Sequence, residues 1–95
     1  MNSSSDTQGL DQWPSQVWAE IASLVPARDE VDRAVLLRLL EIGFLPGEPV
    51  RVIAKGLPGG DPMAVRVGHT TFALRRHEAS MIRVQAMAGG AGSAR

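Results

Sequence analysis

Glycine and proline are frequent between residues 43 and 68, and they divide this part of the chain into apolar stretches of only a few residues. Short apolar runs bounded by such turn residues are typical of β-strands, because a helix needs a longer uninterrupted stretch. The five strands expected from this punctuation are residues 17–23, 50–53, 63–67, 70–74 and 81–84. Five or six short strands favour a mainly β fold, a small and partly open barrel whose closure leaves fewer exposed strand edges.

Alternation within the strands predicts which side chains face the core, since successive residues of a strand point to opposite sides. In residues 63–67, Met63, Val65 and Val67 alternate with Ala64 and Arg66. The other side chains expected to point inward are Val17, Ala19, Ile21, Phe72 and Leu74.

One α-helix is expected after the first strand, over residues 30–42. Asp29 can cap its start by accepting hydrogen bonds from free backbone N–H groups. Gly43 follows the helix, where the chain can turn left-handed without strain at a Cβ, and Phe44 is placed for a closing contact with Leu39. The stripe of this helix that should face the core consists of Val31, Val35, Leu39 and Ile42.

Composition narrows the class of protein. Ten basic residues balance ten acidic ones, so no overall field attracts nucleic acid, and no nucleic-acid partner is expected. The chain of 95 residues has no cysteine, which excludes disulfides, zinc sites built from thiolates and cysteine nucleophiles. Its apolar runs are too short to cross or insert into a membrane, and its start lacks a secretory signal. A cytoplasmic protein is therefore expected.

The chain is expected to divide into three parts. Residues 1–9 are polar and Ser-rich and read as a flexible N-terminus. Residues 86–95 are rich in glycine and alanine and read as a flexible C-terminal tail. The folded domain should span residues 10–85.

Three segments follow one another along the chain: a leucine-rich helix with its Gly-Phe-x-Pro-Gly turn at residues 36–47, a Gly-Asp-Pro turn at residues 60–62, and a Leu-Arg-x-x-Glu-Ala segment at residues 74–79. In this order they resemble the ferrous iron transport protein A (FeoA) family. The family often has glycine in the turn before the first strand, where this chain has Gln16. With the cap residue Asp29, the positions that carry the structural motifs are Leu39, Gly43, Phe44, Pro46, Gly47, Gly60, Asp61, Pro62 and Glu78.

The resemblance implies an SH3-like barrel and a role in ferrous iron uptake beside FeoB, the membrane transporter with a cytosolic GTPase domain. It implies an accessory or regulatory subunit that acts through protein–protein contacts. The same barrel occurs at the C-terminus of iron-dependent repressors, so the alternative is a metal-binding or metal-sensing domain. No enzyme activity is expected, because no motif in the sequence pairs a nucleophile with a base.

The best candidate for a partner-binding surface lies on the helix. Leu36, Leu37 and Leu40 widen the apolar face of the helix beyond what one core needs, and exposed apolar surface marks a contact site. The alternative is that the N-terminal segment, with Trp13 or Trp18, covers these leucines. A homodimer is a further possibility, formed through the helix face or a barrel edge.

Arg75 and the histidines are weaker candidates. Arg75 could stabilise phosphoryl charge in a partner GTPase, although pairing with Glu78 is the simpler expectation. The residues that could hold a divalent metal are His69, His77 and Glu78, but nothing in their spacing places them together. No cofactor is required, and any metal bound there is expected to be weak or adventitious.

Overall fold

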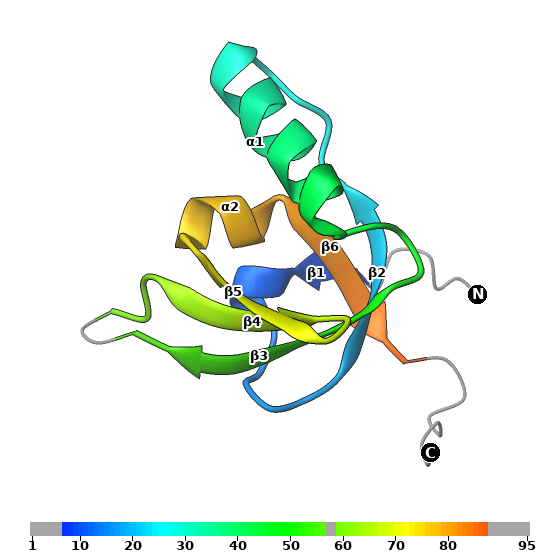
Figure 1. Cartoon of the computed structure of the whole chain (residues 1–95), viewed down its shortest axis with the longest axis vertical. Coiled ribbons are helices and arrows are strands. Elements are labelled where there is room, and N and C mark those ends of the chain that lie inside the picture. Colours follow the sequence, from blue (N-terminus) through cyan, green and yellow to red (C-terminus); the bar gives the residue numbers. More distant parts are fainter. Residues whose placement is uncertain (1–6, 57–58, 88–95) are drawn as a thin grey trace.

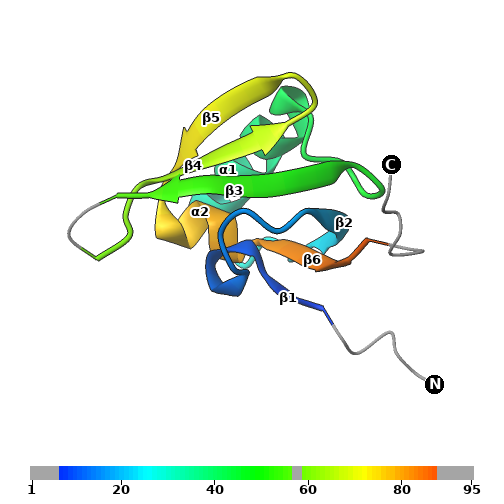
Figure 2. The ribbon, with the colours of Figure 1, turned by 90° about the horizontal axis from the view of Figure 1, so that it is seen from below.

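The computed structural model describes residues 7–56 and 59–87 and confirms the mainly β architecture. Six antiparallel strands form one sheet in the order β1-β6-β2-β3-β4-β5, and the sheet curls into a partly open barrel (Figures 1 and 2). The strands are β1 (Gln8–Gly9), β2 (Ala19–Leu24), β3 (Pro49–Lys55), β4 (Met63–Val67), β5 (Thr70–Leu74) and β6 (Ile82–Ala86). The helices are η2 (Leu10–Gln12, a 3-10 turn), α1 (Glu30–Ile42) and α2 (Arg76–Ser80).

The structure differs from the sequence-based expectation at both ends of the domain. Gln8 and Gly9, expected in the loose terminus, form β1 because they pair with Val84 and Arg83 of β6. At the other end β6 extends to Ala86, the first residue of the expected tail. Most of the two expected flexible segments, residues 1–6 and 88–95, lies outside the described residues.

The first predicted strand begins two residues later than expected, and the prediction that Val17 points inward is wrong. Val17 is 45% exposed and precedes β2, whereas Ala19 and Ile21 are buried as predicted. The cause is the turn at Gln16, whose φ of 71° is left-handed and favours glycine. Gln16 is held there because its N–H and its side-chain amide donate to Val52 and Ile53 carbonyls of β3.

Helix α1 has the predicted bounds and the predicted ends. The Asp29 carboxylate accepts a hydrogen bond from the Asp32 N–H at 2.8 Å, as expected of an N-cap. Gly43 has a φ of 122°, and the N–H of Phe44 donates to the Leu39 carbonyl at 3.0 Å. Leu39 and Phe44 are both fully buried, so the closing contact joins the last turn of the helix to the core.

The predicted core stripe of α1 is correct only near the C-terminal end of the helix. Leu39 is buried, and Val35 and Ile42 pack partly against the core. Val31 is 69% exposed, so its assignment to the core is wrong. The physical reason is visible in Figure 1, where the first turns of α1 project beyond the sheet and find no barrel surface to cover them.

The core fills the inside of the barrel with side chains from nearly every element. The rings of Phe44 and Phe72 lie 6.1 Å apart at their centroids, tilted by 60°. The buried apolar residues include Leu10, Ala19, Ile21, Leu39, Phe44, Val50, Val52, Met63, Val65, Val67, Leu74, Ala79, Ile82 and Val84. The alternation predicted for residues 63–67 is thus confirmed.

Candidate functional site

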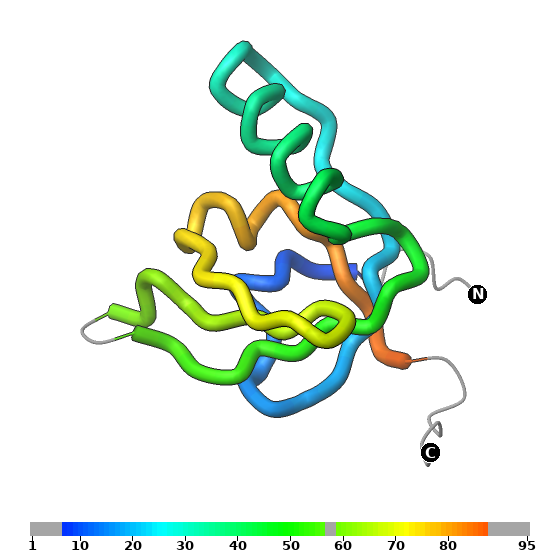
Figure 3. Tube along the Cα trace, in the orientation of Figure 1, coloured from blue at the N-terminus to red at the C-terminus, as the bar shows by residue number. Residues whose placement is uncertain are grey.

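The outward face of α1 exposes leucine side chains. Leu37 is 55% exposed and Leu40 38%, while Leu36 is half-buried. The helix stands away from the body of the barrel along most of its length (Figure 3). We call Leu36, Leu37 and Leu40 the leucine face.

The tryptophans that could have covered the leucine face make contacts elsewhere. Trp13 packs partly against the core, and its Nε1–H donates to the Val17 carbonyl at 3.0 Å. The Trp18 ring lies against the guanidinium of Arg51, 5.2 Å from the ring centroid. Leu37 therefore keeps most of its surface open in the folded chain.

Glu78 of α2 connects this helix to α1. Its carboxylate accepts a hydrogen bond from the backbone N–H of Arg75 at 2.9 Å and forms an ion pair with the Arg38 guanidinium at 3.2 Å. Glu78 thus caps α2 and holds α2 to α1. The expected pairing of Arg75 with Glu78 exists, but through the backbone of Arg75, and Arg38 supplies the charge. Sequence reasoning missed Arg38 because its partner is 40 positions away.

Asp32 forms a second polar link between the two helices. It is only 6% exposed, and its carboxylate lies 3.4 Å from Nε2 of His77 and 3.6 Å from Nε of Arg28. A hydrogen bond from the Arg28 N–H is the main cause that lowers the pKa of Asp32 below its ordinary value of 3.8. Burial acts in the opposite direction, and the contacts with His77 and the Arg28 side chain lower this pKa further.

The candidate metal ligands do not come together. His69 lies in the turn between β4 and β5, whereas His77 lies in α2 beside Asp32. Within residues 7–56 and 59–87, no three histidine or carboxylate side chains form a group that could hold a metal ion.

The Gly-Asp-Pro turn supports the start of α2. The Asp61 carboxylate accepts a hydrogen bond from the Arg76 N–H at 2.9 Å, and the Arg76 guanidinium donates to the Gly59 carbonyl. Gly60 has a φ of 79°, in the left-handed region that favours glycine. The Asp61–Pro62 peptide bond is cis.

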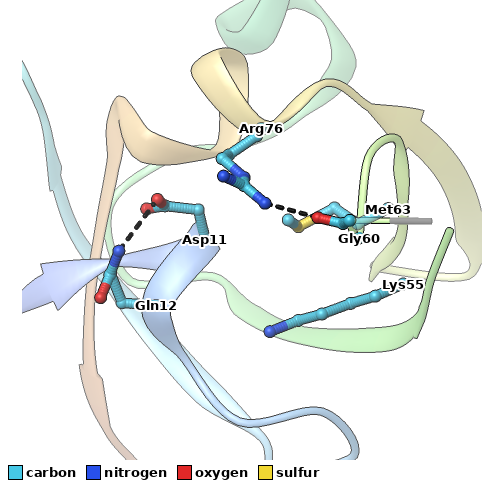
Figure 4. A pocket seen from close by; sticks show the side chains of 7 residues that line it. Asp11, Gln12, Lys55, Gly60, Met63 and Arg76 are labelled. Atoms are coloured by element: carbon cyan, nitrogen blue, oxygen red, sulfur yellow. Dashed lines mark hydrogen bonds between the residues drawn. The ribbon is translucent and has the colours of Figure 1, made fainter. Parts of the chain in front are cut away.

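A cleft of about 410 Å³ opens beside this turn, and the sequence patterns did not reveal it. Its side chains come from η2, the end of β3, the start of β4 and α2 (Figure 4). The lining residues are Asp11, Gln12, Lys55, Gly59, Gly60, Met63 and Arg76. Charges of both signs face the cleft, so it has no strong preference for an anion or a cation.

Comparison with known proteins agrees with the three motifs. A sequence model of the FeoA domain matches residues 10–86. FeoA from Stenotrophomonas maltophilia, an SH3 domain protein crystallised with zinc, is 42% identical, with 81% of this chain and 88% of that chain covered and a TM-score of 0.66. A FeoA-like protein from Clostridium acetobutylicum is 25% identical, with 87% and 90% covered and a TM-score of 0.71.

The barrel is also similar to part of a larger protein. A manganese-dependent transcriptional repressor in complex with manganese is 17% identical, with 90% of this chain and 39% of that chain covered and a TM-score of 0.73. At this identity the likeness shows a common fold and nothing more. A search among curated proteins found no match.

Among the residues that the structure describes, no helix is long and apolar enough to cross a membrane. The family model covers most of the sequence, and the structure shows the SH3-like barrel to which its motifs contribute. The chain belongs to the FeoA family.

Proposed function

We propose that this protein is a cytoplasmic accessory subunit of ferrous iron uptake, which binds the GTPase domain of an FeoB-like transporter and has no catalysis of its own. Family membership supports the role in iron uptake. The relative from Stenotrophomonas maltophilia is described as a candidate ferrous iron transport activating factor. The observation that carries the proposal for this chain is the exposed leucine face of α1.

The leucine face suits a protein contact on energetic grounds. Burying a leucine side chain that was exposed contributes about 1.5–3 kcal/mol, so two such residues can anchor a contact. Leu37 and Leu40 lie on a helix, and an amphipathic helix face commonly docks into an apolar groove of a partner. Arg75, exposed at the start of α2, is the second residue proposed for the contact with FeoB, where its charge helps to choose the partner.

The test replaces Leu37 by Asp and measures two quantities. Iron uptake is followed in a deletion strain complemented with wild type, Leu37→Asp or Arg75→Ala. Binding of the purified proteins to the FeoB GTPase domain is measured by calorimetry. We expect Leu37→Asp to weaken binding by roughly tenfold or more, because the complex would then bury a charge in place of a leucine side chain. Iron uptake should fall as well.

Val17→Asp is the matched control, because Val17 is similarly exposed but lies before β2, away from α1. It should leave binding and uptake unchanged. Circular dichroism must show that each variant is folded. If Leu37→Asp binds the GTPase domain as tightly as wild type, the leucine face is not the contact. If sedimentation shows that Leu37→Asp converts a dimer to a monomer, the face serves self-association instead.

The alternative function, a metal-binding or metal-sensing domain, has a separate test. His77 and Asp32 provide two metal ligands, whereas protein sites that bind zinc tightly have at least three. We expect zinc or ferrous iron to bind weakly and His69→Ala and His77→Ala to support normal uptake. Tight binding that either substitution abolishes would favour the metal-binding function.

A further inference from the structure

Two arginines lie side by side on the outside of the barrel. Arg51 of β3 and Arg66 of β4 are direct partners in the antiparallel register. Their neighbours along the strands, including Val50 and Val65, are buried, so the arginines point to the outer surface. Like charges directly opposite each other destabilise a sheet, which makes this pairing costly unless another group compensates it.

No compensating group is present in the part of the chain that the structure describes. There, neither Arg51 nor Arg66 has a carboxylate within ion-pair distance of 4.0 Å. Glu20 is on the neighbouring strand β2, opposite Pro49, and makes no ion pair with Arg51. The Nε of Arg51 is buried and has no hydrogen-bond partner among the described residues, so a ligand would reach Arg51 through its terminal Nη groups. Both guanidinium groups therefore keep unused capacity to bind an anion.

Trp18 restrains the side chain of Arg51. The Arg51 guanidinium lies 5.2 Å from the centroid of the Trp18 ring, in a cation–π contact. Such a contact restrains the planar group, and a restrained guanidinium can pair with a carboxylate through its two terminal nitrogens. On the other side, Thr71 of β5 is the register partner of Arg66 and offers a hydroxyl. Trp18, Arg51, Arg66 and Thr71 form the arginine row.

We propose that the arginine row binds an acidic segment of a partner protein, whose carboxylates pair with Arg51 and Arg66. A nucleic acid is the less suitable occupant, since single strands bind on successive exposed aromatic rings. Here the one aromatic ring in the row, Trp18, already has Arg51 against it. The row is separate from the leucine face: β3 and α1 lie at opposite ends of the molecule in Figure 1. The proposal therefore holds whether or not α1 binds FeoB.

The test is a titration of the isotope-labelled full chain with a synthetic peptide of alternating glutamate and threonine, followed by NMR. We expect the amide signals of the arginine row and the indole N–H of Trp18 to shift, and the peptide with glutamine in place of glutamate to cause no shift. Arg66→Gln should weaken binding roughly tenfold, because it removes charge-assisted hydrogen bonds. The variant should be at least as stable as wild type, since the repulsion is relieved.

Arg33→Gln is the matched control, because it removes the same charge from an exposed arginine of α1. If it weakens binding as much as Arg66→Gln, the attraction is general and the proposal fails. The proposal also fails if no signal of the row shifts, or if oligothymidylate binds there more tightly than the peptide. Arg66→Lys keeps the charge but loses the planar fork, and its binding should be weaker than wild type but stronger than that of Arg66→Gln.

Discussion

At the scale of single residues, Asp32 shows how one carboxylate can serve several neighbours. It lies in the first turn of α1, accepts a hydrogen bond from the Arg28 N–H at 3.2 Å, and faces both His77 and the Arg28 guanidinium. Each of these contacts favours the ionised form, which is why the pKa of Asp32 is lowered although burial opposes ionisation.

This shift gives a pH-dependent prediction for Asp32→Asn. Because the folded pKa lies below the unfolded one, ionised Asp32 stabilises the folded protein above about pH 4, and this contribution is lost as the pH falls through the folded pKa. We expect the variant to be less stable than wild type at pH 7, with the difference shrinking in acid. Urea unfolding at several pH values checks this, and a difference that grows in acid would contradict it.

At the scale of elements, α1 is held differently at its two ends. Its last turns pack on the core through Leu39 and Ile42. Its first turns depend on polar contacts, namely the Asp29 cap and the Asp32–His77 link, with the Arg38–Glu78 ion pair further along. In both ion pairs the basic partner, His77 or Arg38, is more than half exposed, so solvent screens the attraction and the cap is the strongest of these restraints on the helix start.

Asp29→Ala tests the cap. It removes the acceptor of the Asp32 N–H and should lower the free energy of unfolding by about 0.5–2 kcal/mol. Glu30→Ala is the control, since Glu30 is exposed and its ion pair with Arg33, at 3.8 Å, is weak. Urea unfolding should show a clear loss for Asp29→Ala and almost none for Glu30→Ala, and equal losses would show that the cap contributes nothing.

At the scale of the whole molecule, stability comes from one small core without disulfide bonds. Leu39 and Leu37 lie two positions apart on the same helix, but Leu39 is fully buried and Leu37 is mostly exposed. The fold thus separates leucines that hold α1 to the barrel from leucines that are free for a partner.

Leu39→Ala should therefore destabilise the protein by about 2–5 kcal/mol, through lost burial and a cavity in the core. Leu37→Ala should change the free energy of unfolding by less than about 0.5 kcal/mol, as is usual for exposed positions. Thermal unfolding of both variants measures the contrast. Similar losses at the two positions would mean that Leu37 is part of the folding core.

Local signals account for what could be predicted without the structure. The helix bounds and caps depend on neighbouring residues such as Asp29 and Gly43, and the alternation of residues 63–67 depends on one strand only. The exposure of Val31 could not be predicted, because helical spacing shows which residues share a face but not how far the barrel reaches beneath it. The small barrel itself could be predicted, because short strands and one capped helix are local features of the sequence.

The sequence by itself thus determined helix α1, five of the six strands, their order and the family, since these depend on spacing, turn residues and motifs in the chain. The tertiary structure alone decided which helix leucines stay open, which carboxylates join α1 to α2, and that Arg51 lies opposite Arg66 and against the Trp18 ring. The physical reason is that each of these features joins residues distant in sequence. Only strand register and helix placement bring such residues together.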